Sequence, residues 1–219
     1  MDELLAEQIR YYRERAPEYD ATSRPDGDPF AGIAAMSVAE LRGLGPVQRA
    51  IELGAGTGQF TGVLAEIARH VTAVDTSPEV LAINAANVRA PNVERVVGDL
   101  FSWRPPQPAE LVVFGFLLSH IPRERLAAFW GSLREMLEPD GTAFVIDESP
   151  QGVWREERVG QDHEIVLRTL SDGRAFRIVK VLWETEELMA ALVSLGWNAR
   201  LTSRDPFYWG TVRAAGGVR

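Results

Sequence analysis

A glycine-rich turn between an apolar stretch and a helix-like stretch is the feature that most constrains this chain. Residues 47–53 have the apolar character of a buried strand and run directly into Gly54-Ala-Gly-Thr-Gly58. Apolar residues then recur over 60–68 with helical spacing. Glycine lets the backbone turn tightly and approach a ligand closely, and the free N–H groups of a helix start attract polar ligands. The pattern predicts a strand–loop–helix unit that binds a nucleotide-like molecule.

The order of the glycines separates three kinds of nucleotide loop. A phosphate-binding loop needs a Lys followed by Ser or Thr, and this loop contains no Lys. A dinucleotide-binding fingerprint needs a third glycine at position 59, which is Gln59, whereas the glycine stands one residue earlier at Gly58. The third arrangement is G-x-G-x-G preceded by an acid, Glu52. A carboxylate beside such a loop can meet the ammonium group of an amino-acid cofactor.

The rest of the chain alternates between strand-like and helix-like segments. The predicted strands are 47–53, 71–74, 93–97, 111–116, 142–147, 198–203 and 207–214. The predicted helices are 4–15, 33–44, 60–68, 77–88, 122–137 and 184–195, with a loop at 23–29 and a β-rich hairpin at 165–183. Such alternation predicts a doubly wound α/β fold, with a seven-stranded, mostly parallel sheet and helices on both faces. The short link at 204–206 makes the last strand antiparallel.

Acidic residues follow the second and third predicted strands. Asp75 stands 21 residues after Gly54, where a carboxylate suits a ribose diol; the alternative is a capping role at the helix that Ser77-Pro78 opens. Asp99 follows the third strand, and its alternative role is that of an ordinary turn residue. Because ligands of open α/β sheets bind at the carboxyl ends of the strands, residues 114–120 are also expected to line the site.

Taken in order, these segments resemble class I S-adenosylmethionine-dependent methyltransferases over about residues 47–147. The resemblance rests on Ile51–Gly58, Asp75, Gly98-Asp-Leu-Phe101, residues 114–122 and the turn at 137–142, where Asp140 replaces a glycine of the family pattern. It implies a Rossmann-like fold with S-adenosylmethionine as the methyl donor. It assigns donor binding to Glu52, Gly54, Gly56, Gly58, Asp75, Thr76, Asp99, Leu100 and Phe116, with Asp99 and Leu100 holding the adenine.

The segments outside this core also receive roles from the resemblance. Residues 1–45 resemble a lid over the donor, in which Tyr11 and Tyr19 contact its methionine end and Arg15 meets its carboxylate; the alternative is an amphipathic surface helix. Residues 46–147 form the donor-binding core. Residues 148–183 are an insertion that roofs the substrate pocket, and 184–219 supply the closing helix and last two strands of the same domain.

The chain contains three histidines, and one of them is a candidate for proton transfer. His120, just beyond the fourth strand, is the candidate general base because an imidazole titrates near neutral pH. Its alternative role is to hydrogen-bond a carbonyl or touch the donor. His163 lies in the insertion as a possible substrate contact, and His70 is structural. No spacing indicates a metal site.

Composition limits the partners. The net charge is −8 and no Lys/Arg cluster carries interleaved aromatics, which argues against nucleic acid. The absence of cysteine excludes disulfides and cysteine nucleophiles but indicates no redox compartment. There is no basic-then-apolar leader and no membrane-length apolar run, which predicts a cytoplasmic protein. We expect an enzyme that methylates O or N of a small molecule, as a monomer or homodimer. The alternatives are a C- or protein-methyltransferase, a non-catalytic donor-binding partner, and a dehydrogenase-like binder that the residue at position 59 disfavours.

Overall fold

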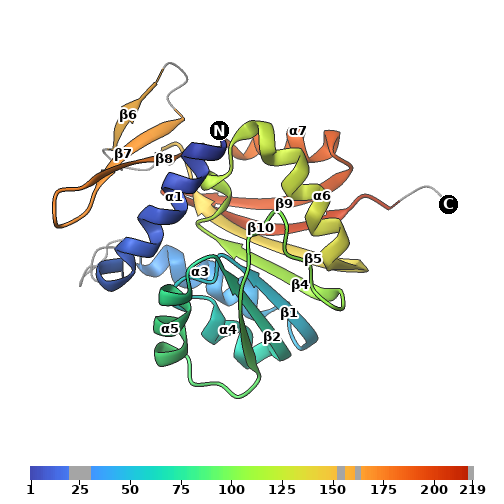
Figure 1. The fold of residues 1–219 in the computed structure, drawn as a ribbon. Coiled ribbons are helices and arrows are strands. Elements are labelled where there is room, and N and C mark those ends of the chain that lie inside the picture. The colour runs from blue at the N-terminus through green and yellow to red at the C-terminus, as the bar shows by residue number, and fades with distance from the viewer. Residues whose placement is uncertain (20–30, 152–155, 161–163, 217–219) are drawn as a thin grey trace.

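The computed structural model describes residues 1–19, 31–151, 156–160 and 164–216, and its centre is a seven-stranded sheet (Figure 1). The strand order is β3-β2-β1-β4-β5-β10-β9. The strands are β1 (Val47–Leu53), β2 (Ala68–Asp75), β3 (Val93–Val97), β4 (Ala109–Gly115), β5 (Leu137–Glu148), β9 (Trp197–Arg204) and β10 (Phe207–Ala214). The first five are parallel, and β10 runs antiparallel to both β5 and β9. The predicted doubly wound sheet is confirmed.

Helices cover both faces of the sheet. One face carries α3 (Ala31–Arg42), α4 (Thr61–Ile67) and α5 (Pro78–Asn87), and the other carries α6 (Leu126–Met136) and α7 (Thr185–Ser194). The two-residue period of β4 explains how one strand serves both faces. Val112 and Phe114 pack with the α6 side, whereas Leu111 and Val113 pack with the α3 and α4 side. Burial on both faces accounts for the nearly continuous apolar sequence of the central strands.

Local sequence signals fix several element boundaries. Ser77 caps α5, because its hydroxyl accepts a hydrogen bond from the Val80 N–H at 3.1 Å, and Pro78 follows at the first helical position. The predicted turn at 137–142 lies inside β5. There the pairing with β4 steps from Ala109–Leu137 to Leu111–Thr142, so residues 138–141 form an irregularity within the strand.

A small second sheet lies beside the N-terminal helix. It consists of β6 (Glu157–Val159), β7 (Ile165–Thr169) and β8 (Ala175–Val179) in antiparallel order, and α1 (Asp2–Arg15) packs along it (Figure 1). The hairpin of β7 and β8 agrees with the prediction. The strand at 157–159 was not predicted from the sequence, because this short stretch depends on its pairing with β7.

The remaining short elements are the 3-10 turns η1 (Ala16–Glu18), η2 (Leu118–His120) and η3 (Arg123–Arg125). The helix predicted at 122–137 therefore starts as a separate turn. The loop predicted at 23–29 lies outside the described residues. Within the described ranges, no helix has both the length and the apolar content needed to cross a membrane.

The tight pairing of β9 with β10 generates a test of the fold. A Cβ at Gly210 would lie 1.9 Å from the Arg200 carbonyl oxygen, whereas a Cβ at Gly131 in α6 would meet nothing within 4 Å. We expect Gly210→Ala to lower the free energy of unfolding by about 3 kcal/mol, because the obstacle is backbone. Gly131→Ala is the matched control and should raise it by about 0.5–1 kcal/mol, because alanine favours a helix. Urea denaturation measures both, and equal effects would contradict the pairing.

Candidate functional site

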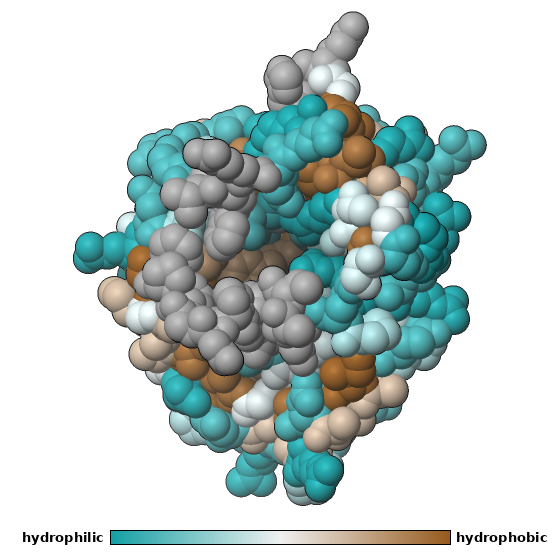
Figure 2. Space-filling view, turned by 90° about the vertical axis from the view of Figure 1, so that its left-hand side faces the viewer, coloured by the Kyte–Doolittle hydropathy of each residue, from teal (hydrophilic) through white to brown (hydrophobic). Residues whose placement is uncertain are grey.

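A cavity opens at the carboxyl ends of the parallel strands, beneath α1. Its walls are the loops that follow β1, β2, β3 and β4, together with side chains of α1. Figure 2 faces the side of the molecule where α1 and α5 lie and shows a hollow with apolar atoms at its base, within a mainly hydrophilic surface. This position is the one at which open α/β sheets bind ligands.

The glycine loop forms one wall through backbone conformations that favour glycine. Gly54, Gly56 and Gly58 have φ angles of 64°, 53° and 106°. Gly54 and Gly56 line the cavity, but Gly58 is not among the described lining residues. A Cβ at Gly58 would lie 2.9 Å from a methyl group of Val88. The third glycine therefore lets the loop pack against the end of α5.

Asp75 connects this loop to the next one. Its carboxylate accepts a hydrogen bond from the Gly56 N–H at 3.0 Å and another from the Ser77 N–H at 3.0 Å. Burial raises its pKa, and these two N–H donors oppose that rise. Asp75 and Thr76 both line the cavity. The capping role predicted as the alternative for Asp75 belongs to Ser77. Asp75 instead braces the glycine loop and lines the cavity, a position compatible with a ribose contact.

Glu52 lies beneath the loop rather than in the cavity wall. Its side chain is 2% exposed and accepts a hydrogen bond from the Thr61 hydroxyl at 2.5 Å. Asn84 donates to the same hydroxyl at 2.8 Å and to the Gly56 carbonyl at 3.2 Å. Burial raises the pKa of Glu52 to about 8. The structure therefore gives Glu52 a supporting position and does not bring it to the donor space.

The third loop brings Asp99 and Leu100 to the cavity. One carboxylate oxygen of Asp99 accepts hydrogen bonds from the N–H groups of Phe101 at 3.0 Å and Ser102 at 3.1 Å. Among the described residues, its other oxygen has no protein partner. The turn role of Asp99 is present in the structure, and the second oxygen leaves room for a ligand contact.

The end of β4 supplies a strained wall. Phe116 has a φ angle of 53°, which is rare for a bulky side chain, and its N–H donates to the Ile146 carbonyl at 2.8 Å. Strained backbone of this kind concentrates at functional sites. Gly115 precedes it because a Cβ there would lie 2.2 Å from the ring of Phe60. Gly115, Phe116 and Leu117 all line the cavity.

Of the two tyrosines predicted to face the donor, Tyr19 lines the cavity, and in α1 Tyr12 takes the place predicted for Tyr11. Tyr11 itself is absent from the described lining. Tyr11 is buried in the apolar cluster of the small sheet, with its ring 5.7 Å from that of Phe176. Adjacent helical residues point about 100° apart, so only one of the two tyrosines can face the site. Arg15 stacks over the Tyr19 ring at 4.7 Å.

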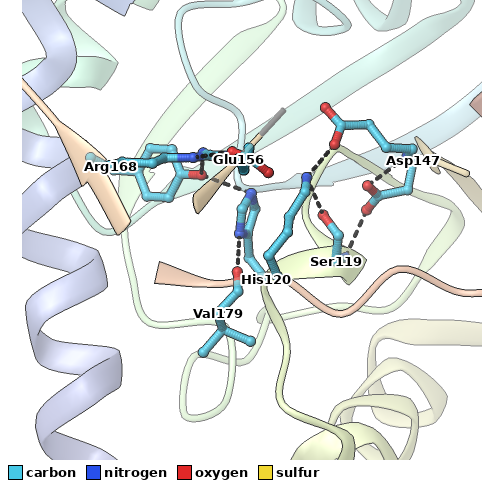
Figure 3. A network of polar contacts seen from close by, with 9 residues as sticks. Ser119, His120, Asp147, Glu156, Arg168 and Val179 are labelled. Atoms are coloured by element: carbon cyan, nitrogen blue, oxygen red, sulfur yellow. Dashed lines mark hydrogen bonds and ion pairs between the residues drawn. The ribbon is translucent and has the colours of Figure 1, made fainter. Parts of the chain in front are cut away.

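His120 is held through both ring nitrogens, as Figure 3 shows, and through its backbone carbonyl. Its Nδ1 donates to the Val179 carbonyl at 2.7 Å, and its Nε2 accepts from the Tyr12 hydroxyl at 2.7 Å. The amide of Gln8 donates to the His120 carbonyl at 3.1 Å and accepts from the Val179 N–H at 2.9 Å. Burial lowers the pKa of His120 well below its ordinary value, and the charges of Lys180 and Arg168 lower it further. His120 reaches the cavity as a neutral imidazole with both nitrogens occupied.

Two charged side chains flank this imidazole and were not predicted from the sequence. Arg168 pairs with Glu156 at 2.5 Å and donates to the Tyr12 hydroxyl at 3.0 Å. Lys180 pairs with Glu148 and lies 3.3 Å from the Ser119 hydroxyl. One sequence signal could have drawn attention to Lys180, because it is the chain's single lysine. His163 lies outside the described residues, and His70 is exposed on β2.

Known methyltransferases resemble this chain in sequence and in structure. Residues 50–141 match a family described as a methyltransferase domain. The solved DhpI–SAH complex is 36% identical, with a TM-score of 0.82, over 99% of this chain and 98% of that chain. The DhpI–SAM–HEP complex has the same identity and TM-score, over 96% of this chain and 97% of that chain.

Two curated relatives are also named as methyltransferases. An uncharacterized methyltransferase of Staphylococcus carnosus (strain TM300) is 25% identical over 208 residues, which cover 92% of this chain and 96% of the relative. A trans-aconitate 2-methyltransferase of Rhizobium leguminosarum bv. trifolii (strain WSM2304) is 36% identical over 128 residues, which cover 58% of this chain and 45% of the relative.

The buried, neutral state of His120 generates a pH test. Below pH about 6.5 a histidine of the unfolded chain takes up a proton, whereas native His120 does not. The unfolded state then binds more protons, so stability falls as pH decreases, by at most about 1.4 kcal/mol per pH unit. We expect the stability of His120→Asn not to fall in this way. The difference in unfolding free energy between the wild type and this variant should therefore become smaller as the pH decreases from 6.5 to about 5.

Urea denaturation at a series of pH values measures that difference. His70→Asn, on an exposed side chain, controls for the loss of a histidine elsewhere. If the wild-type and His120→Asn curves run parallel through this range, the buried imidazole does not have the protonation behaviour that we assign to it.

Proposed function

Because the chain belongs to the class I S-adenosylmethionine-dependent methyltransferases, we propose that it transfers a methyl group from S-adenosylmethionine to an oxygen or nitrogen atom of a small-molecule acceptor. One observation carries the small-molecule part of this proposal. The loops that fit the donor and the wall formed by Tyr12 and His120 line one cavity, and α1 covers it. A covered cavity of this kind suits a small acceptor better than a protein or nucleic-acid chain.

The residues of the first wall fit the donor. The backbone of Gly54 and Gly56 makes room for close approach, since a Cβ at Gly56 would point at nothing nearer than 3.9 Å. We assign the ribose hydroxyls to the carboxylate of Asp75 and the adenine amino group to the unpaired oxygen of Asp99. Leu100 and Phe116 offer apolar contact, and Tyr19 covers the methionine end. Glu52 and Gly58 support the loop from below instead of touching the donor.

The donor, once bound, supplies a methyl group on a positively charged sulfur. This chain's contribution is to orient the acceptor, hold it near that methyl group and keep water away. Helix α1 and the buried residues at the end of β4 serve the last purpose. Methyl transfer needs a proton acceptor only where the nucleophile is a hydroxyl or an ammonium group.

We assign His120 a positioning role in place of the general base suggested by its sequence position. Its lone pair already accepts the Tyr12 proton, and burial together with nearby positive charge disfavours protonation. A proton could reach His120 only if the Tyr12 bond broke. The imidazole instead fixes the Tyr12 hydroxyl toward the cavity.

The name of one relative agrees with a small acceptor. Trans-aconitate 2-methyltransferase is named for a small acid, and its similarity covers 58% of this chain. The negative charge of this chain, −8, also favours a small acceptor over a nucleic acid. We propose that the segment 148–183 and α1 together bound the acceptor side of the cavity.

Donor binding gives the first test of this proposal. We expect Asp75→Ala to weaken S-adenosylhomocysteine binding by roughly 10- to 100-fold, because a buried carboxylate that accepts two hydroxyl protons is lost together with the Gly56 brace. Calorimetry measures the affinity. Asp140→Ala, in the exposed turn within β5, is the control and should bind normally. An Asp75→Ala protein with unaltered affinity would remove Asp75 from the donor site.

The class of acceptor gives the second test. The protein is incubated with donor carrying a labelled methyl group and a cell extract divided into small-molecule, protein and nucleic-acid fractions. We expect label to enter the small-molecule fraction, because α1 covers the cavity, and we expect Tyr12→Phe to reduce the rate. Label confined to the protein or nucleic-acid fraction would show that the small-acceptor proposal is wrong.

A further inference from the structure

We propose that the acceptor of this enzyme is an oxyanion, which binds between Lys180 and Arg168 beside Tyr12 and uses one of its own oxygen atoms as the nucleophile. This inference rests on the proposed function and narrows its acceptor from any oxygen or nitrogen atom to a carboxylate or a phosphate-type group. It is carried by two cations next to the cavity residues Tyr12 and His120: Arg168, which is partly buried and bonds to Tyr12, and Lys180, which is buried near His120.

The placement of lysine in this chain is the first observation. Of its 23 Lys and Arg residues, only Lys180 is a lysine, so every surface cation is an arginine. This one lysine is 2% exposed. Burial of an ammonium group is costly unless it is paired, and a surface role cannot explain it. Its Nζ contacts Glu148 and Ser119, at the carboxyl ends of β5 and β4, where the sheet presents its ligands.

Arg168 approaches the same wall from the small sheet. Its guanidinium donates to Glu156 and to the Tyr12 hydroxyl, and Tyr12 lines the cavity. The side chain is 19% exposed, so a small ligand can reach its edge. A planar guanidinium beside a hydroxyl is well suited to bind a carboxylate or phosphate group through two hydrogen bonds. In Figure 3 the contacts of Arg168 and those of Ser119 lie on opposite sides of His120.

The charge balance favours a negative acceptor. Lys180 and Arg168 are balanced by Glu148 and Glu156. Asp147 is buried, and both of its oxygens accept backbone N–H groups, from Ser119 and Glu148, while burial raises its pKa. The two ion pairs carry no net charge, and the bound donor adds a sulfonium charge beside them. An anionic acceptor neutralises that charge, whereas a cationic amine would add to it.

A hydroxyl group in the same cluster is without a partner. Tyr208 lies directly opposite Asp147 in the pairing of β10 with β5, and it is 1% exposed. Among the described residues its hydroxyl has no hydrogen-bond partner. Nearby acidic groups and burial raise its pKa, so it remains a donor. A buried donor of this kind needs an acceptor atom, which a ligand oxygen can provide.

The chemistry of an oxyanion also matches the lack of a free base. Both nitrogens of His120 are occupied, and a carboxylate or phosphate oxygen needs no deprotonation. An oxygen lone pair forms the new bond to the methyl carbon, and the carbon–sulfur bond breaks with its electron pair moving to sulfur. The products are a methyl ester and neutral S-adenosylhomocysteine sulfur, and no proton moves. One negative and one positive charge disappear together.

The single lysine allows a direct test. Protein labelled with carbon-13 at the lysine ε position gives one side-chain NMR signal, from Lys180. The S-adenosylhomocysteine complex is titrated with trans-aconitate and glutarate as carboxylates, with glycerol phosphate as a phosphate ester, and with glutaramide and pentanediamine as neutral and cationic probes. We expect a saturable shift with the carboxylates or with the phosphate ester, which tells these two sources apart, and no shift with the other two probes.

Substitutions at arginines leave the Lys180 signal in place and test which charges near it bind the anion. Arg168→Met should weaken binding of the active anion by roughly tenfold or more, because a charge-assisted pair is lost. Arg168→Lys, which keeps the charge but not the planar fork, should be intermediate. Arg174→Met, on an exposed arginine of the same hairpin, is the control and should leave anion binding unchanged.

The outcomes separate this inference from the proposed function. If S-adenosylhomocysteine binds but no anion shifts the lysine signal, or if glutaramide or pentanediamine shifts it as strongly, the oxyanion inference is overturned and the methyltransferase assignment stands. If S-adenosylhomocysteine itself does not bind, the donor site is wrong. A saturable, anion-specific shift that Arg168→Met weakens and Arg174→Met preserves supports the inference.

Discussion

The pairing of a buried imidazole with a tyrosine hydroxyl joins the parts of this molecule that must meet to form a site. His120 lies after β4, Tyr12 comes from α1 and the Val179 carbonyl belongs to β8. These segments are far apart in the sequence, and each would expose unpaired polar groups without the others. The cover of the cavity therefore depends on one neutral side chain that satisfies a donor and an acceptor at once. The ion pairs of Arg168 with Glu156 and of Lys180 with Glu148 lie next to this imidazole.

Local chemistry explains why much of the fold could be predicted. The glycines at 54 and 56 adopt the left-handed backbone that their position requires, and Ser77 with Pro78 starts α5 as expected. Uniformly apolar strands imply burial on both faces, which the alternating packing of β4 confirms. These features depend on residues within a few positions of one another, so a single sequence contains the information needed to infer them.

The parts that could not be predicted depend on long-range contacts. Helical periodicity indicates that Tyr11 and Tyr12 face different ways, but only the position of the small sheet decides which of them reaches the cavity. Glu52, the acid before the glycine loop, was predicted to bind the donor. The structure instead places it beneath the loop, where Thr61 donates to its carboxylate. The pairing of β6 with β7 and the burial of Lys180 arise from the way the insertion folds back onto the sheet. Neither leaves a periodic pattern in the sequence.

The attachment of α1 has a kinetic consequence. Side chains of α1 line the cavity, so movement of this helix changes the opening through which ligands exchange, and its contacts affect how fast a product leaves. Several of those contacts are exposed ion pairs, including Glu7 with Arg177 and Arg13 with Glu79, and such pairs are weak and screened by salt. The buried bonds of Gln8 and Tyr12 are not screened in this way. Ionic strength therefore acts on the ion pairs of the helix, while the buried bonds of Gln8 and Tyr12 hold it against the sheet when those pairs weaken.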